Sequence, residues 1–479
     1  MLYLLSLHPK VRSEKEGHIL VFYPLQALLR RLRSMRNLNP ARIVVVSFGI
    51  IILTGTLLLM LPWASRDGQS TDLITCLFTA TSASCVTGLI LVDTWTHWTL
   101  FGQVVILAMI QLGGLGFMTV ITSISFALRR RIGLSERLIM VSTLNLNDMD
   151  GVVRMVRHTL MGTLIIEGMG AVILTLCFLP EFGLAGGLWR GIFHAVSAFC
   201  NAGFDLLGSK GEFTSLITYN GNPVVLLTIL CLIVIGGLGF FVWEDLIRNW
   251  RTPRRLSLYS KLVILMTGAL ILGGAVFFLG VEWDNPNTLG GMPWWKKILN
   301  SFFQSVTLRT AGFDSIGQGG LRDSSLAMSC ILMLIGGSSG STAGGLKTST
   351  VGILLLTMRA GLAGREEVTI RRRTISQRRV MTALTLTLIV VVLFLGIAMT
   401  ISLTDDVHFL SAAFEAASAL ATVGVTVGIT PTLTPFSHII LIIAMFLGRV
   451  GIMSFSVAFL ARGRNAAKIH YPMVDIMIG

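Results

Sequence analysis

Charged residues are scarce in this chain of 479 residues. They make up 13% of the sequence, whereas soluble domains carry roughly 25%. Hydrophobic residues make up 53%, and the mean hydropathy is +0.77. Because apolar runs long enough to cross a bilayer recur along the whole chain, this composition excludes a water-soluble globule and a disordered chain. The sequence predicts an all-α polytopic membrane protein embedded in a lipid bilayer.

Motifs of catalysis and redox chemistry are also missing. The six cysteines are scattered without C-x-x-C spacing, which indicates small buried side chains and neither a disulfide framework nor a zinc site. No H-E-x-x-H pattern and no pair of aspartates lies within an apolar run, so we do not expect an enzyme. No G-x-G-x-x-G pattern follows a strand, so we expect no cofactor and no nucleotide bound by this chain.

The net charge of +14 comes from basic residues that gather in short stretches. Of the 38 Lys and Arg residues, 29 lie in residues 1–42, 127–158, 247–261, 359–380 and 462–468. Basic loops that alternate with apolar spans follow the positive-inside rule and mark cytoplasmic ends. The pattern predicts cytoplasmic N- and C-termini and no contact with nucleic acid.

One pattern, a Phe followed by nine residues and a Gly, occurs four times. The copies are Phe78–Gly88, Phe193–Gly203, Phe302–Gly312 and Phe414–Gly424. A serine follows the Phe by four residues in three copies, whereas Val306 stands there in the third. Apolar runs precede the copies at 43–63, 159–180, 262–281 and 380–403, and follow them at 100–127, 223–247, 325–358 and 435–461.

These copies predict four pseudo-symmetric helix/pore-loop/helix repeats. We expect a cytoplasmic N-terminal segment at 1–42, repeats at 43–128, 129–248, 249–360 and 361–460, and a C-terminal tail at 461–479. The segment between the two runs of a repeat is too short to cross, and both runs end in basic loops. Each segment is therefore expected to enter from outside as a short helix and to return as extended chain.

Four such loops predict one central ion pore. Non-helical backbone at membrane depth must be buried in protein or line a watery path, and rings of backbone carbonyls replace the hydration shell of K⁺ in selective pores. Close helix packing through small residues is the alternative. No carboxylate stands at or just before the glycines, which disfavours a divalent cation. The predicted K⁺ filter residues are Val86, Thr87, Gly88, Asn201, Ala202, Gly203, Thr310, Ala311, Gly312, Thr422, Val423 and Gly424.

A glycine-rich stretch interrupts the second run of the third repeat and predicts a gate below the filter. It consists of Gly336, Gly337, Ser338, Ser339, Gly340, Ser341, Thr342, Ala343, Gly344 and Gly345, and Lys347 follows it. The other repeats keep only short glycine clusters at 113–116, 236–239 and 448–451. Arg449 lies within an apolar run at the same depth and is expected to reach the carbonyls and hydroxyls of the gate, because an unpaired cation in a membrane is costly.

Five further charged residues within or beside the apolar runs have expected roles. Glu167 is expected to pair with a polar neighbour, and Glu415 to begin the fourth pore helix, where a carboxylate suits the positive helix end. Asp205 and Asp314 follow filter glycines and either concentrate cations or cap the loops. Arg309 is expected to brace the filter from behind.

The chain resembles the Trk/Ktr/HKT superfamily of potassium transporters over nearly its whole length from about residue 43. The strings FTATSASCVTGL (78–89), SAFCNAGF (197–204), RTAGFDS (309–315) and ATVGVT (421–426) carry the resemblance. It is closest to the Ktr-type membrane subunit, because Trk-type chains usually have two extra N-terminal helices. The resemblance implies a homodimer in the bacterial plasma (inner) membrane, K⁺ as the transported ion, Na⁺ as an activator, and a cytoplasmic ring of nucleotide-binding regulatory subunits (RCK-type, KtrA-like).

Two mechanisms stay open at this point. The chain is either a K⁺-conducting subunit gated by its partner or a Na⁺- or H⁺-coupled K⁺ symporter. Coupled carriers are often built from inverted repeats, whereas these repeats are parallel, which favours the pore.

Overall fold

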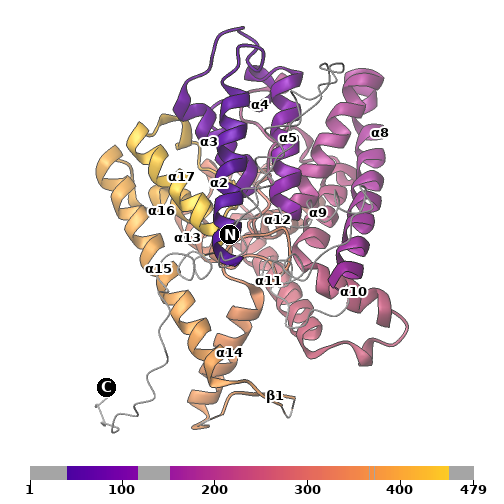
Figure 1. Cartoon of the computed structure of the whole chain (residues 1–479), viewed down its shortest axis with the longest axis vertical. Helices are drawn as coiled ribbons and strands as arrows, with labels where there is room; N and C mark the ends of the chain where they lie inside the picture. Colours follow the sequence, from indigo (N-terminus) through magenta and orange to yellow (C-terminus); the bar gives the residue numbers. More distant parts are fainter. Residues whose placement is uncertain (1–39, 117–151, 366, 372, 452–479) are drawn as a thin grey trace, which may run out of the picture. The chain divides into compact units, whose positions relative to one another are not determined.

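The structure is a computed structural model that describes residues 40–116, 152–365, 367–371 and 373–451. Helices dominate these residues (Figure 1). The two strands β1 (Thr369–Ile370) and β2 (Arg373–Thr374) form a short antiparallel hairpin. The predicted all-α fold is therefore confirmed. The predicted N-terminal segment and C-terminal tail lie outside the described residues.

Three repeats contain a long first helix, a short pore helix and a second helix. The first repeat comprises α2 (Pro40–Leu59), α3 (Leu73–Cys85), the single turn α4 (Thr94–His97) and α5 (Leu100–Leu115). The third comprises α11 (Leu258–Glu282), α12 (Trp294–Thr307), α13 (Asp323–Leu334) and α14 (Thr348–Leu362). The fourth comprises α15 (Gln377–Asp405), α16 (Phe409–Leu420) and α17 (Pro435–Val450).

The second repeat joins its first span and its pore helix in one bent element. Helix α8 (Val152–Cys200) contains Pro180, and Gly183 adopts a φ of 68° inside it. Only glycine adopts such a conformation without steric cost, so the chain turns back here and the pore helix begins. Helices α9 (Pro223–Leu238) and α10 (Phe240–Asn249) follow and are bent by 97° relative to each other.

Contacts between repeats close a ring. Helix α5 packs on α8, α9 on α12, α13 on α16, and α17 on α3, so each second helix contacts the next repeat and the fourth repeat contacts the first. Figure 1 shows α17 beside α2 and α3, although about 350 residues separate them in the sequence. Four parallel repeats thus surround one common axis.

The helices after the pore loops are shorter than the predicted apolar runs. We expected an interruption in the third repeat alone, and this expectation is wrong. Helices α5, α9 and α17 are each followed directly by a glycine, Gly116, Gly239 and Gly451, with φ angles of 81°, 90° and 85°. The last glycine of each cluster therefore breaks its helix at the matching place, because glycine alone enters this region freely. By length and composition, four described helices can span a membrane, or five if α9 and α10 count as one.

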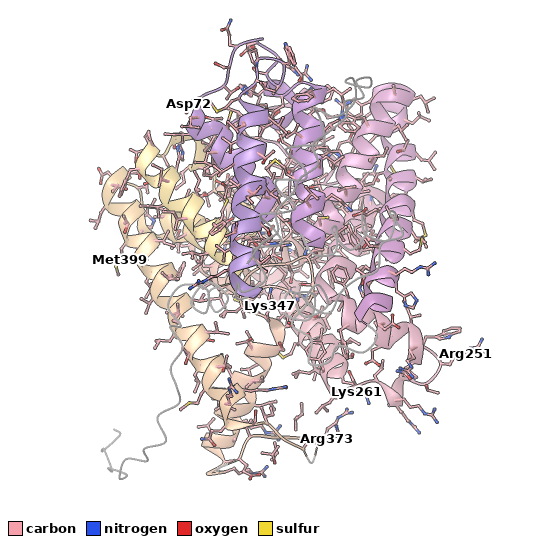
Figure 2. All side chains as sticks on the ribbon, in the orientation of Figure 1. Asp72, Arg251, Lys261, Lys347, Arg373 and Met399 are labelled. Atoms are coloured by element: carbon pink, nitrogen blue, oxygen red, sulfur yellow. The ribbon has the colours of Figure 1, made fainter. Side chains whose placement is uncertain are left out.

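Four of the charged residues labelled in Figure 2 separate along the long axis of the picture, and Lys347 lies between them. Arg251, Lys261 and Arg373 lie at one end and Asp72 lies at the other. Arg251 lies in the connection between α10 and α11, Lys261 lies in the first turn of α11, and Arg373 belongs to β2. Two of the predicted basic stretches therefore gather at the same end, as the positive-inside rule requires of loops on one side of a membrane.

The first glycine of each short cluster packs directly on the end of its own pore helix. A Cβ atom added to Gly113, Gly236 or Gly448 would collide with the carbonyl oxygen of Ser84, Phe199 or Leu420, respectively. We therefore expect Gly113→Ala, Gly236→Ala and Gly448→Ala each to destabilise the fold by about 1–3 kcal/mol, the usual cost of overpacking. Thermal unfolding of purified protein in detergent measures this effect.

Gly268→Ala provides the matched control, because nothing lies within 4 Å of a Cβ added there in α11. It should leave the melting temperature unchanged or raise it, since alanine favours a helix by about 1 kcal/mol over glycine. Melting of Gly113→Ala at the temperature of the wild type would contradict the packing described here.

Candidate functional site

The four candidate filter segments meet through their glycines. A Cβ atom added to any of the four would collide with the backbone of another segment. The colliding pairs are Gly88 with Ala202, Gly203 with Gly312, Gly312 with Val423, and Gly424 with Thr87. The first segment thus contacts the second, the second the third, the third the fourth, and the fourth the first. The segments that the sequence pattern singled out therefore surround one axis.

The same unusual backbone conformation occurs in all four segments. The residue two places before each glycine has a positive φ, although it is not glycine: Val86 at 58°, Asn201 at 60°, Thr310 at 69° and Thr422 at 53°. The glycines follow with φ of 99°, 72°, 86° and 97°. A left-handed conformation costs an L-residue roughly 1–2 kcal/mol, and such strain concentrates at functional sites. Because the same strained conformation recurs in all four segments, it indicates a backbone geometry that is retained for function.

Hydroxyl groups on the pore helices hold each segment in place. Ser82 and Ser418 accept the N–H of Gly88 and Gly424, both at 3.0 Å. In the second repeat, Ser197 donates to the carbonyl of the residue after the glycine, Phe204, at 2.7 Å. The predicted hydroxyl positions thus brace three of the four segments.

The third repeat corrects the predicted register of its pore helix. Phe303 is fully buried, whereas its neighbour Phe302 is only partly buried. Thr307 stands four residues after Phe303 and donates to the Phe313 carbonyl at 2.6 Å. Thr307 therefore corresponds to the serine of the other repeats, a position that the sequence pattern assigned to Val306. The buried Phe and the hydroxyl that follows it thus stand one residue closer to the glycine than in the other repeats, and the doublet Phe302-Phe303 hid this shift in the sequence.

The carbonyl groups of the twelve candidate filter residues accept no hydrogen bond from the residues that the structure describes. All twelve residues are buried, and within the described chain no hydrogen bond ends on any of their carbonyl oxygens. The hydroxyls of Thr87, Thr310 and Thr422 are also buried without a partner there. Buried polar groups without partners are costly. A dehydrated monovalent cation is the ligand that such a ring of neutral oxygen atoms suits.

The predicted gate residues form a loop between α13 and α14. The neck of this loop is closed where the Gly336 N–H donates to the Leu346 carbonyl at 2.9 Å. Its body lies against the second repeat: the Ser338 N–H donates to the Gly237 carbonyl at 3.0 Å, and the Phe240 N–H donates to the Gly340 carbonyl at 2.9 Å. The loop therefore packs on the break between α9 and α10.

The gate loop also contacts one pore helix and one filter segment. The Thr342 hydroxyl donates to the carbonyl of Phe199 at 3.2 Å, near the end of α8. A Cβ atom added to Gly344 would collide with the Thr422 hydroxyl. Lys347 Nζ donates to the Ala343 carbonyl at 2.8 Å and holds the end of the loop. These contacts bring the predicted gate and the candidate filter together.

Arg449 connects the gate loop to the first repeat. Its guanidinium donates to the carbonyls of Thr342 and Gly113, and to that of Gly114 at 3.2 Å. The predicted contact with the gate carbonyls is therefore observed, and the contacts with Gly113 and Gly114 were not predicted. Arg449 stands in the fourth cluster where Gly114 and Gly237 stand in the first and second. An alignment of the clusters could have predicted that Arg449 faces the same space below the filter as these two glycines.

Glu415 lies in the middle of α16 and not at its start, so its predicted position is wrong. Its carboxylate accepts the hydroxyls of Thr426 and Thr430 at 2.5 and 2.6 Å, and the Val427 N–H at 3.1 Å. Glu415 therefore fixes the loop that follows the fourth filter segment. The apolar pattern before residue 415 did not reveal that the pore helix begins at Phe409.

The two aspartates behind the filter glycines cap their own loops. Asp205 accepts the N–H of Leu207 at 2.9 Å, and Asp314 accepts the N–H groups of Ile316, Gly317 and Gln318 at 3.0–3.1 Å. Arg309 is 7% exposed, and its Nε has no hydrogen-bond partner among the described residues.

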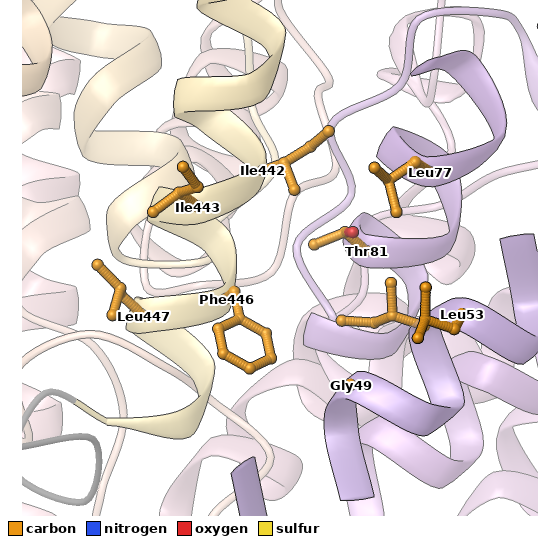
Figure 3. Close-up of a pocket in the computed structure, with 9 residues that line it drawn as sticks. Gly49, Leu53, Leu77, Thr81, Ile442, Ile443, Phe446 and Leu447 are labelled. Atoms are coloured by element: carbon orange, nitrogen blue, oxygen red, sulfur yellow. The ribbon is translucent and has the colours of Figure 1, made fainter. Parts of the chain in front are cut away.

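A separate cavity of about 390 Å³ lies between α2, the first pore helix α3, and α17 (Figure 3). Leu53 of α2, Leu77 and Thr81 of α3, and Phe446 of α17 are among the side chains that line it. Its lining carries no charged group. An uncharged apolar lining of this kind does not fit the path of an ion.

Comparisons with known proteins find a family of cation transport proteins. The model of the TrkH family, described as a cation transport protein, matches residues 20–467. The potassium/sodium uptake protein NtpJ of Enterococcus hirae is 42% identical over 455 residues, which cover 93% of this chain and 99% of that protein. The Ktr system potassium uptake protein B of Bacillus subtilis is 39% identical, covering 92% and 97%.

One solved structure has the same fold. The crystal structure of the potassium transporter TrkH from Vibrio parahaemolyticus superposes with a TM-score of 0.69 and covers 88% of this chain and 86% of that chain. The two sequences are 17% identical, so this likeness concerns the fold alone.

Proposed function

The chain belongs to the TrkH family of cation transport proteins, and from that premise we propose that it takes up potassium ions through the ring of its four filter segments. It is a multi-pass membrane transporter and not an enzyme. The names of relatives at 39% and 42% identity support potassium as the transported ion. The observation that carries the proposal is the ring of buried carbonyl groups without partners.

The filter works by exchanging water for carbonyl oxygen. An ion that enters from outside loses its hydration shell and gains the oxygen atoms of the four segments. The oxygens are neutral dipoles, so binding is weak enough for release. The strained backbone and the hydroxyl braces keep the ring from closing on a smaller ion. This rigidity favours K⁺ over Na⁺.

The gate loop and Arg449 form the second barrier. The guanidinium lies below the filter, bonded to carbonyls of the first and third repeats, and its positive charge opposes the passage of a cation. The same bonds hold the gate loop under the filter. Release of the loop from Arg449 opens the path.

A cytoplasmic partner controls this release. The basic end of the molecule, which includes Arg251, Lys261 and Arg373, faces the cytoplasm and offers a positively charged docking surface (Figure 2). The partner is a ring of nucleotide-binding regulatory subunits, and the membrane subunit forms a homodimer with one pore in each protomer. The resemblance to Ktr-type subunits supports both assemblies.

Na⁺-coupled uptake of K⁺ is the second candidate function. One observation favours it: the relative NtpJ is named a potassium/sodium uptake protein. Uptake of K⁺ that ceases without a Na⁺ gradient would favour coupling over a pore.

Substitution of the filter glycines tests the filter. Gly88→Ser, Gly203→Ser, Gly312→Ser and Gly424→Ser each place a side chain at a positive φ against the neighbouring segment. Strain of roughly 1–2 kcal/mol at this point should lower the preference for K⁺ over Na⁺ about tenfold, since a factor of ten corresponds to about 1.4 kcal/mol. Uptake of both ions into proteoliposomes measures the preference.

Gly428→Ser is the matched control. Gly428 has a φ of 100°, close to the 97° of Gly424, but nothing lies within 4 Å of a Cβ added there. It should carry similar backbone strain and keep the K⁺ preference. Unchanged relative uptake of the two ions in all four filter variants would refute the carbonyl filter.

Release of the gate loop should raise K⁺ flux. Arg449→Ala removes hydrogen bonds to Thr342, Gly113 and Gly114, and a hydrogen bond to a charged group contributes about 1.5–3 kcal/mol. Roughly tenfold faster isotopic flux is expected from equal amounts of folded protein, with the K⁺ preference intact because the filter is untouched. Deletion of Ser339–Ser341 should act in the same direction.

Arg449→Lys is the control for charge. A lysine keeps the positive charge but lacks the planar fork that reaches several carbonyls, so an intermediate flux is expected. Wild-type flux in both Arg449→Ala and the loop deletion would rule out a gate here. Faster flux with loss of K⁺ preference would place the filter elsewhere.

Nucleotide should change the flux only when the regulatory partner is present, because we assign nucleotide binding to the partner. The flux is measured with and without nucleotide, both in liposomes that contain this chain alone and in liposomes that also contain the partner. Specific binding of nucleotide by the purified chain alone would contradict this assignment.

A further inference from the structure

A carboxyl group is buried behind the second filter segment. Glu167 lies in the membrane-spanning part of α8 and is 6% exposed. Gln111 of α5 donates its Nε2 to both carboxyl oxygens at 3.2 Å. Among the described residues, no Lys, Arg or His forms an ion pair with Glu167. A carboxyl at this depth is costly and is retained where it has a function.

The third member of this cluster is the residue that precedes the filter. Cys200 ends α8, and the next residue is Asn201, which begins the second filter segment at a φ of 60°. The Cys200 thiol lies 3.6 Å from Gln111 Oε1 and 3.9 Å from Glu167 Oε1, as a donor to either. The carboxyl and the amide therefore hold the side chain at the point where the pore helix changes into the strained segment.

The cluster also adjoins the contact between Arg449 and the first repeat. A Cβ atom added to Gly114 would lie 2.6 Å from the Cys200 sulfur, and the Gly114 carbonyl accepts from Arg449. Gln111 lies one turn earlier on the same helix. Displacement of Cys200 would therefore press on the turn of α5 that binds Arg449.

The described parts of the other repeats lack this arrangement. Cys85 holds the place of Cys200 in the first repeat, three residues before its glycine, and its thiol makes no hydrogen bond within the described chain. Gln111 is the polar neighbour with which Glu167 was expected to pair. The link from this pair to the filter was not predicted. Among the described residues, Glu167 is the buried carboxyl that contacts the residue before a filter segment, whereas Glu415 fixes the loop after the fourth segment.

We propose that Glu167 is a positioning residue that acts through Gln111 and Cys200 to hold the second filter segment in its K⁺-selective conformation. The proposal rests on the proposed function and assigns part of its selectivity to a residue that does not touch the ion. Hydrogen bonding is the property that matters. The amide of Glu167→Gln should preserve it, and the apolar side chain of Glu167→Leu should abolish it.

The test compares the concentration dependence of K⁺ and Na⁺ uptake in proteoliposomes with equal amounts of folded protein. Glu167→Leu should lower the K⁺ preference about tenfold, equivalent to about 1.4 kcal/mol, through the ratio of the apparent KM values for the two ions. Glu167→Gln should stay within about threefold of the wild type. Cys200→Ala should resemble Glu167→Leu, and the double variant should lose little more, because residues of one network are not additive.

Glu282 supplies the matched control. It is a fully buried carboxyl at the end of α11 that accepts from Asn285 at 2.6 Å, Thr288 at 2.7 Å and the Arg322 N–H at 3.1 Å. These contacts do not include the filter. Glu282→Leu should reduce the yield of folded protein and leave the K⁺ preference of the folded fraction unchanged.

Three outcomes would overturn the inference. They are an unchanged K⁺ preference in Glu167→Leu, an equal loss in Glu167→Gln and Glu167→Leu, and a loss of the same size in Glu282→Leu. If Glu167→Leu fails to fold, Gln111→Leu and Cys200→Ala decide the question by the same measurement. Absence of any K⁺ preference in the wild type would instead refute the proposed function.

Discussion

Extended backbone at membrane depth is the constraint on which this structure depends. Four short segments run through the middle of the protein, and their carbonyl groups have no partner within the described chain. No hydrocarbon can satisfy such groups, so protein must shield them from the lipid. The ring of contacts between successive repeats does so. Two features then determine the width of the ring of filter segments. They are the glycines that contact the next segment, and the serine and threonine hydroxyls that hydrogen-bond to the turns.

The four repeats share the ring of filter segments but differ in the residues below it. Three second helices break at a glycine of positive φ, whereas the third repeat inserts a loop at that place. In the fourth repeat an arginine replaces a glycine of the cluster and reaches two other repeats. Under the proposed function, the symmetric part of the molecule carries the ring for the ion, and its departures from symmetry carry the groups that close the path.

The sequence predicts the symmetric part well, because one pattern recurs at nearly equal spacing. The four repeats, the pore helices and the meeting of their glycines follow from that pattern. It predicts the asymmetric part less well. Apolar composition does not mark where α5 and α17 end, and the adjacent Phe302 and Phe303 conceal the register of α12. The carbonyl partners of Arg449 on the first repeat depend on how distant helices pack, which spacing along the chain does not encode.

The position of bound ions tests the central claim most directly. Rubidium substitutes for potassium and scatters strongly, so crystals of the protein grown in rubidium salt would reveal where a dehydrated ion rests. The account predicts anomalous density on the axis, enclosed by Gly88, Gly203, Gly312 and Gly424 and their neighbouring carbonyls. Ordered rubidium held elsewhere in the membrane region, with no density on this axis in protein that transports potassium, would contradict it.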